Sequence, residues 1–197
     1  MTDATDVVAA LGAYLSVRVL FHGEGLDRLR DRAHAELVER LVSLLRSLGW
    51  EVATEVSFNH YGERGSIDLL AFHPATRALL VVEVKTVVPD VGGMMMTLDR
   101  KVRLASDIAR ERGWHAQTVS RLIVLPEDST ARRRVAAHAA TFSNAFPVRN
   151  VGVRAWLRQP GAAMSGVLFL SKARGGSQRR ERRAVSGHPA RPARTRN

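Results

Sequence analysis

The chain contains no cysteine, no long apolar run and almost no acidic residues in its last part. Without cysteine a disulfide framework is excluded, and a structural zinc site is disfavoured because such sites are built mainly from cysteine and histidine. No apolar stretch approaches the roughly 20 residues of a membrane-spanning helix, and no apolar run follows a basic segment as in a secretory signal. We therefore expect a cytoplasmic protein that has no membrane partner.

Positive charge is concentrated in one segment of the sequence. The net charge of the 197 residues is +11, and the segment from Lys172 to Asn197 has nine basic residues and one acidic residue, Glu181. This segment is rich in Arg, Gly, Ser and Pro and has too few apolar side chains to offset its ordering entropy, so we expect a disordered tail. Such a tail would attract phosphate groups without specificity, or would only increase solubility.

The rest of the chain predicts one α/β domain. Residues 25–171 suffice for a single hydrophobic core, with residues 1–24 as an N-terminal extension and 172–197 as the tail. Hydrophobic periodicity and turn residues predict the following elements: a short helix at 6–14, a strand at 15–21, a helix at 26–48 that ends at Gly49, strands at 50–59, 66–72 and 78–86 with a turn at 61–65, a helix at 97–112, a strand at 120–125, a helix at 129–146 capped by Ser129, and strands at 151–157 and 166–170. This order predicts a mixed sheet flanked by helices.

The neighbouring predicted strands at 66–72 and 78–86 each carry an acidic residue in an apolar run. Asp68 is the only acidic residue of its strand, and Glu83 and Lys85 follow in the next. Residues i and i+2 of a strand point to the same face, so Glu83 and Lys85 share one side. The hairpin connection places the Asp68 strand beside the Glu83 strand. We therefore predict that the three side chains converge at one end of the sheet.

These three residue types suit metal-assisted hydrolysis. Mg²⁺ or Mn²⁺ prefers oxygen ligands and is often held by one or two carboxylates, here Asp68 and Glu83, with water and phosphate completing its shell. A metal-bound water loses its proton more easily, and Lys85 could orient that water or contact the phosphate. The alternative is a cross-strand ion pair on a solvated sheet edge, worth only about 0–1 kcal/mol.

The spacing of these residues resembles that of the PD-(D/E)XK nuclease superfamily. Asp68 is followed, after 14 residues, by Glu83-Val84-Lys85. The resemblance implies a restriction-endonuclease-like fold with an α-β-β-β-α-β core. It also implies Mg²⁺ bound by Asp68, Glu83 and the backbone carbonyl of Val84, and an attacking water assisted by Lys85.

A narrower resemblance covers residues 25–171. The segments Gly62–Asp68, Glu83–Thr86 and Leu98–Leu104 are similar to nuclease-like domains that follow a helix-turn-helix in actinobacterial regulator-like proteins. No helix-turn-helix fits into the segment before residue 25. The resemblance implies a nucleic acid partner, with DNA as the expected form, and leaves open whether the protein is a monomer or a homodimer.

The first helix departs from the superfamily pattern. Many members carry a glutamate on this helix that faces the site, but Glu36 and Glu39 project away from the apolar side of the helix, whereas His34 lies on it. We call this side the leucine stripe; it consists of Leu37, Leu41, Leu44, Leu45 and Leu48. His34 is therefore a further site candidate, or else a hydrogen-bonded histidine between helix and sheet. Arg100 and Lys101, on a later helix, are candidates for contacting the DNA backbone, or else belong to a solvated helix face.

Two functions follow from the sequence. The first is a Mg²⁺-dependent DNA endonuclease that hydrolyses phosphodiester bonds. The second is a catalytically inactive DNA-binding or transcription-regulator-associated module with the same fold. A structural domain whose charges only pair with one another is a third alternative.

Overall fold

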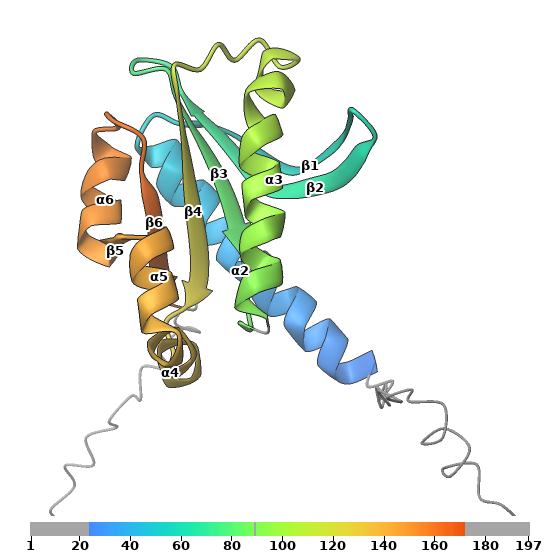
Figure 1. Ribbon diagram of the computed structural model, residues 1–197, viewed down its shortest axis with the longest axis vertical. Helices are drawn as coiled ribbons and strands as arrows, with labels where there is room; N and C mark the ends of the chain where they lie inside the picture. The colour runs from blue at the N-terminus through green and yellow to red at the C-terminus, as the bar shows by residue number, and fades with distance from the viewer. Residues whose placement is uncertain (1–23, 89, 172–197) are drawn as a thin grey trace, which may run out of the picture.

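The computed structural model describes residues 24–88 and 90–171 (Figure 1). The predicted helix at 6–14, strand at 15–21 and disordered tail at 172–197 lie outside the described residues. The elements are α2 (Glu24–Ser47), β1 (Glu51–His60), β2 (Glu63–His73), β3 (Ala78–Val84), α3 (Val91–Arg110), β4 (Thr118–Pro126), α4 (Ser129–Ala137), α5 (Ala139–Ala145), β5 (Val148–Arg149), α6 (Asn150–Arg158) and β6 (Ser165–Leu170). Within these described residues, no helix is both long enough and apolar enough to cross a membrane.

A six-stranded mixed sheet forms the centre of the protein. Its order is β1-β2-β3-β4-β6-β5. Strands β1, β2 and β3 form an antiparallel meander, whereas β3, β4, β6 and β5 are parallel neighbours. Helices α2 and α6 cover one face, and α3, α4 and α5 cover the other (Figure 1). The predicted mixed α/β fold is therefore confirmed, including the order helix, three strands, helix, strand up to β4.

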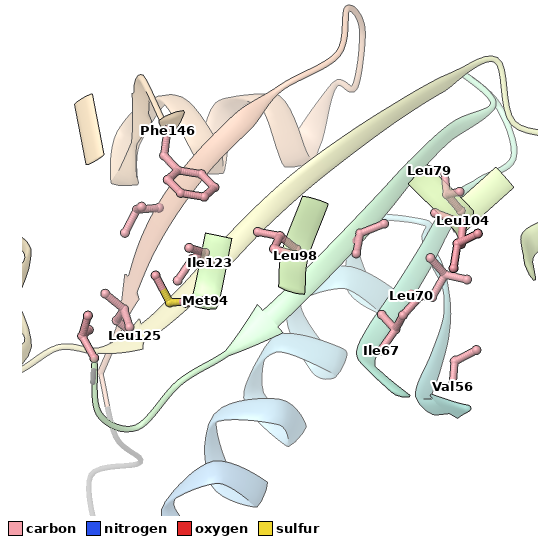
Figure 2. Close-up of a cluster of buried hydrophobic side chains, with 14 of the residues drawn as sticks. Val56, Ile67, Leu70, Leu79, Met94, Leu98, Leu104, Ile123, Leu125 and Phe146 are labelled. Atoms are coloured by element: carbon pink, nitrogen blue, oxygen red, sulfur yellow. The ribbon is translucent and has the colours of Figure 1, made fainter. Parts of the chain in front are cut away.

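Strand β3 connects the two halves of the core. All seven of its residues are buried. Leu79 and Val81 point into the cluster beneath α3, part of which is drawn in Figure 2, while Leu80 and Val82 point into the cluster beneath α2. Each buried Leu or Val side chain contributes about 1.5–3 kcal/mol to stability. Strand β3 is therefore expected to be rigid and to hold the residues at its end in fixed positions.

Helix α2 ends as its sequence predicts. Gly49 has a φ of +84°, and the Trp50 N–H donates to the Leu45 carbonyl over 3.1 Å, which is a glycine C-terminal motif. The indole Nε1 of Trp50 then donates to the Leu157 carbonyl of α6 over 2.9 Å. The end of α2 is thus joined to the second helix on the same face.

Three predictions in the last third of the domain are wrong. Residues 151–157 form most of helix α6 rather than a strand, because Val153 and Leu157, four residues apart, are buried together on one side of a helix. The predicted helix at 129–146 is two helices, α4 and α5, which break at His138. The cap of α4 is Asp128 instead of Ser129, since Asp128 Oδ1 accepts the Ala131 N–H over 2.8 Å.

Helix α3 begins six residues before the predicted start at 97. Asp90 caps it by accepting the N–H groups of Gly92 and Gly93 over 3.0 and 3.1 Å. A Cβ at position 93 would lie 2.6 Å from Asp90 Oδ2, so this arrangement of the cap favours glycine there. Gly92 and Gly93 are therefore part of the first turn of the helix, and Met94 is buried in the core.

The β1–β2 hairpin extends beyond the rest of the sheet (Figure 1). Its turn is only Tyr61-Gly62, both with positive φ, as expected of a two-residue hairpin loop. Gly65, predicted in the turn, is instead a β2 residue that pairs with Phe58 of β1. The Phe58 ring lies over Gly65, and a Cβ at position 65 would be 2.7 Å from Phe58 Cζ.

Replacing Gly65 with alanine is expected to lower the free energy of unfolding by about 1–3 kcal/mol, because the buried Phe58 ring has to move. Urea denaturation followed by circular dichroism measures this change. The matched control is Gly161→Ala, where no atom lies within 4 Å of the added Cβ, and a change below about 0.5 kcal/mol is expected. Equal effects of the two substitutions would contradict this account of the hairpin.

Candidate active site

Asp68 lies where β2 stops pairing with β3. The last pair of the register is Leu69 with Val82, and one further step would set Asp68 opposite Glu83. There, Asp68 Oδ2 accepts the backbone N–H of Val84 over 2.8 Å. A carboxylate oxygen thus takes the place of a carbonyl oxygen in the ladder. Beyond this point β2 is paired with β1 only.

Glu83 points to the α3 side of β3, as strand alternation predicts, and is only 2% exposed. Its Oε1 is 2.7 Å from Lys85 Nζ, and its Oε2 is 2.5 Å from Lys101 Nζ. Lys85 follows the last residue of β3, and its backbone N–H donates to the Val124 carbonyl of β4 over 3.0 Å. The Lys85 side chain is about one third exposed, so its ammonium group is accessible from outside the cluster.

Lys101 is buried at the centre of the site. It belongs to the stripe of α3 that faces the sheet, between Leu98 and Ala105, and its side chain is 6% exposed. Besides its 2.5 Å contact with Glu83, its Nζ lies 3.5 Å from Asp68 Oδ1. The two carboxylates therefore converge on one ammonium group. Lys101 does not lie on a solvated helix face, which corrects the alternative predicted for it.

We call Asp68, Glu83, Lys85 and Lys101 the charged cluster. With both acids ionised and both lysines protonated, its formal charge is zero. The first three members were predicted to converge, and the structure brings them together at the end of β3. The alternative of an ion pair on a solvated sheet edge does not describe the cluster, because Glu83 and Lys101 are buried.

A cleft of about 380 Å³ borders the cluster on the α2 side of the sheet. Asp68, Val84 and Lys85 line it from the strands, and His34 lines it from α2. His34 is thus beside the cluster, as its place on the leucine stripe suggested. The other lining residues are Arg30, Asp31, Thr86 and Val87.

Asp31 is a site residue that sequence reasoning missed. It lies on α2 one turn before His34 and lines the same cleft. The glutamates that were considered for this role point elsewhere: Glu36, for example, pairs with Arg32 over 3.4 Å at the surface. The available signal was its spacing, since a residue three positions before His34 lies on the same side of a helix.

A second cleft, of about 210 Å³, lies on the α3 side of the cluster. Glu83 and Lys85 line it from the strand side, together with Asp90, Gly93, Met94 and Thr97 from the start of α3. Lys85 therefore borders both clefts.

Arg100 is not part of the charged cluster. Its Nε is 4.0 Å from Glu63 Oε2, at the hairpin, and Arg103 approaches the same carboxylate to 2.5 Å. Arg100 and Lys101 are adjacent in sequence but contact different acids. Glu63 offsets only one of the two positive charges of Arg100 and Arg103, and the contact of Arg100 with a DNA backbone stays a prediction.

The carboxylate oxygens of the charged cluster are the type of ligand that Mg²⁺ and Mn²⁺ prefer. Among the residues that the structure describes, no three His, Cys, Asp or Glu side chains form a group able to hold a metal ion. The carboxylates of Asp68 and Glu83 nevertheless converge on one position, which the positively charged Lys101 ammonium occupies. One or two carboxylates with water and phosphate oxygens are the usual ligands of Mg²⁺, whereas zinc would want histidine or cysteine.

Comparisons with protein-family models, with curated proteins and with solved structures find no match to the chain. Function is therefore inferred from the charged cluster, the two clefts and the fold.

Proposed function

We propose that the protein is a Mg²⁺- or Mn²⁺-dependent nuclease of restriction-endonuclease-like fold that hydrolyses phosphodiester bonds in DNA. One observation carries the proposal: Asp68 and Glu83 converge on a single cationic point, with Lys85 beside them at the border of two clefts. The order of elements from α2 to β4 supports it, since the PD-(D/E)XK resemblance implies the same helix-strand order.

In this proposal Asp68, Glu83 and the carbonyl of Val84 hold the metal. When bound, the metal makes an attacking water more acidic and stabilises the negative charge that develops at phosphorus. The Val84 N–H fixes one oxygen of Asp68, and burial in the core fixes Glu83. Both carboxylates are thereby held in one orientation before substrate arrives, which reduces the cost of reorganisation.

Lys85 acts at the solvent side of the cluster. Its Nζ is held 2.7 Å from Glu83 but remains partly exposed, so it can donate a hydrogen bond to a phosphate oxygen or to the attacking water. Arg30 and Asp31 line the same cleft and add one charge of each sign. The attraction to the DNA backbone, without reading bases, is therefore attributed to the net charge of +11 of the whole chain.

A second function is favoured by the neutrality of the cluster. Two lysines balance two carboxylates, and two of the four side chains are almost fully buried, as in a network that fixes a fold. A catalytically inactive DNA-binding or transcription-regulator-associated module would have this property. In such a module the metal-free cluster would be the functional state.

The decisive experiment is cleavage of supercoiled plasmid by the parent protein and by Lys85→Met. The parent is expected to nick the plasmid with Mg²⁺ or Mn²⁺ and to stop when EDTA removes the metal. Loss of a group that serves the attacking water is expected to slow cleavage by about 100-fold or more in Lys85→Met. Arg103→Met, which removes a charge paired with Glu63, should cleave like the parent. DNA binding without cleavage in all three proteins would instead support the inactive module.

A further inference from the structure

Lysine is rare in this protein, and it is concentrated in the charged cluster. The sequence has three lysines, at positions 85, 101 and 172, and 27 arginines. Two of the three lysines contact Glu83. An ammonium group is a compact point charge, whereas the guanidinium of arginine is a broad planar fork. The space between Asp68 and Glu83 thus holds the basic side chain that most resembles a small cation.

The Lys101 ammonium and a divalent cation would need the same oxygens. Lys101 Nζ lies 2.5 Å from Glu83 Oε2 and 3.5 Å from Asp68 Oδ1. Mg²⁺ binds its oxygen ligands at about 2.0–2.1 Å, so a metal ion shared by these carboxylates would coincide with the ammonium or touch it. Repulsion between the two cations would add to this steric conflict.

We propose that Lys101 is an internal cation that competes with the divalent metal for the point between Asp68 and Glu83. Metal binds there only when the Lys101 ammonium moves away, and Lys101 returns when the metal leaves. This inference rests on the proposed function, because it concerns the cation that the nuclease would use. Two consequences follow. Without metal the site stays folded and neutral, and Lys101 lowers the affinity of the site for metal.

The structure also provides a place for the displaced ammonium. The 210 Å³ cleft on the α3 side is bordered by Glu83, Thr97 and Asp90. Thr97 lies one helical turn before Lys101, and long side chains on a helix lean toward its N-terminus. The four-carbon stem of Lys101 can therefore move its charge toward Thr97, at the edge of this cleft, without any movement of α3.

Metal affinity measures the competition directly. Mn²⁺ binding is titrated by electron paramagnetic resonance of the free ion in the parent protein, in Lys101→Met and in Arg103→Met. Lys101→Met is expected to bind Mn²⁺ at least about tenfold more tightly than the parent, because a positive charge no longer occupies the site. Arg103→Met removes the same charge from an exposed place on α3 and is expected to bind like the parent. Equal affinities of Lys101→Met and the parent would overturn the proposal.

A second measurement uses the parent protein alone and covers the case in which Lys101→Met does not fold. An amine-reactive ester labels the lysines with and without saturating Mn²⁺, and mass spectrometry reports the rate at Lys101. The rate is expected to rise several-fold with Mn²⁺, since the ammonium leaves its buried position between the carboxylates. A rate at Lys101 that stays unchanged by saturating Mn²⁺, or a parent and variant that bind no Mn²⁺ at all, would overturn the proposal.

These readouts separate the competition from the nuclease activity. A parent that cleaves DNA with Mg²⁺ while Lys101 stays protected contradicts the competition and leaves the nuclease standing. A tighter Mn²⁺ affinity in Lys101→Met, without DNA cleavage by either protein, supports the competition and contradicts the nuclease.

Discussion

Asp68→Asn is expected to lower metal-dependent DNA cleavage by at least about 100-fold, because the Lewis-acid contribution of a metal is worth several kcal/mol and each 1.4 kcal/mol is a factor of ten. An asparagine oxygen is neutral and holds Mg²⁺ poorly. It still accepts the Val84 N–H that now bonds to Asp68 Oδ2 over 2.8 Å, so the strand junction is expected to survive. Initial rates of plasmid nicking and urea denaturation of the same preparation test both statements.

The matched comparison is Asp68→Ala, which removes the charge and the hydrogen-bond acceptor together. It is expected to be less stable than Asp68→Asn by about 1–3 kcal/mol, since the Val84 N–H is left without its acceptor. Two results would contradict the proposed role of Asp68: cleavage by Asp68→Asn at the parent rate, or a variant that is inactive only because it is unfolded.

Glu83→Met is expected to lower the free energy of unfolding by about 3–5 kcal/mol, because it leaves the buried Lys101 ammonium without its closest counter-charge. Asp68 remains 3.5 Å away and compensates only in part. The double variant Glu83→Met, Lys101→Met replaces the buried pair by apolar side chains of similar length. It is expected to recover most of the loss, as buried ion pairs replaced in full are often close to neutral.

A double-mutant cycle in urea measures this coupling. The parent, the two single variants and the double variant give the interaction free energy of Glu83 and Lys101, which should be about 3 kcal/mol or more, because the double variant is expected to recover most of what each single variant loses. Glu63→Met with Arg103→Met is the control cycle, since that pair is equally close but Arg103 is mostly exposed. A smaller coupling is expected there, because exposed pairs contribute only about 0–1 kcal/mol. Simple additivity of Glu83 and Lys101 would mean that their contact does not stabilise the fold.

The positions of Asp68, Glu83 and Lys85 could be predicted from sequence because they depend on local rules. Strand alternation determines the face of Glu83, and a hairpin places β2 beside β3. The clear stop of α2 at Gly49 has the same origin, since one glycine with positive φ ends a helix wherever it stands. These rules need no knowledge of how distant elements pack.

Lys101 could not be assigned in this way, because its role depends on how α3 docks against the sheet. Its spacing from Leu98 and Ala105 placed it on the apolar stripe, and a lysine on such a stripe was the available signal. Helix α6 was misread for a related reason. The spacing of Val151, Val153 and Leu157 fits the apolar alternation of a strand. Only the burial of Val153 together with Leu157, four residues later, shows that the segment is a helix.

The hydrogen bond between Asp68 and Val84 means that one side chain can be conserved for two reasons, the proposed metal binding and the structure of the sheet. The carboxylate that would hold the metal also closes the gap where β2 leaves β3, so position 68 is constrained even when nothing is cut. A homologue that has lost its chemistry would still benefit from an acid or amide there. An aspartate at this position in another sequence therefore indicates a shared fold. A lysine at the position of Lys85 is the better indicator of the proposed enzymatic activity.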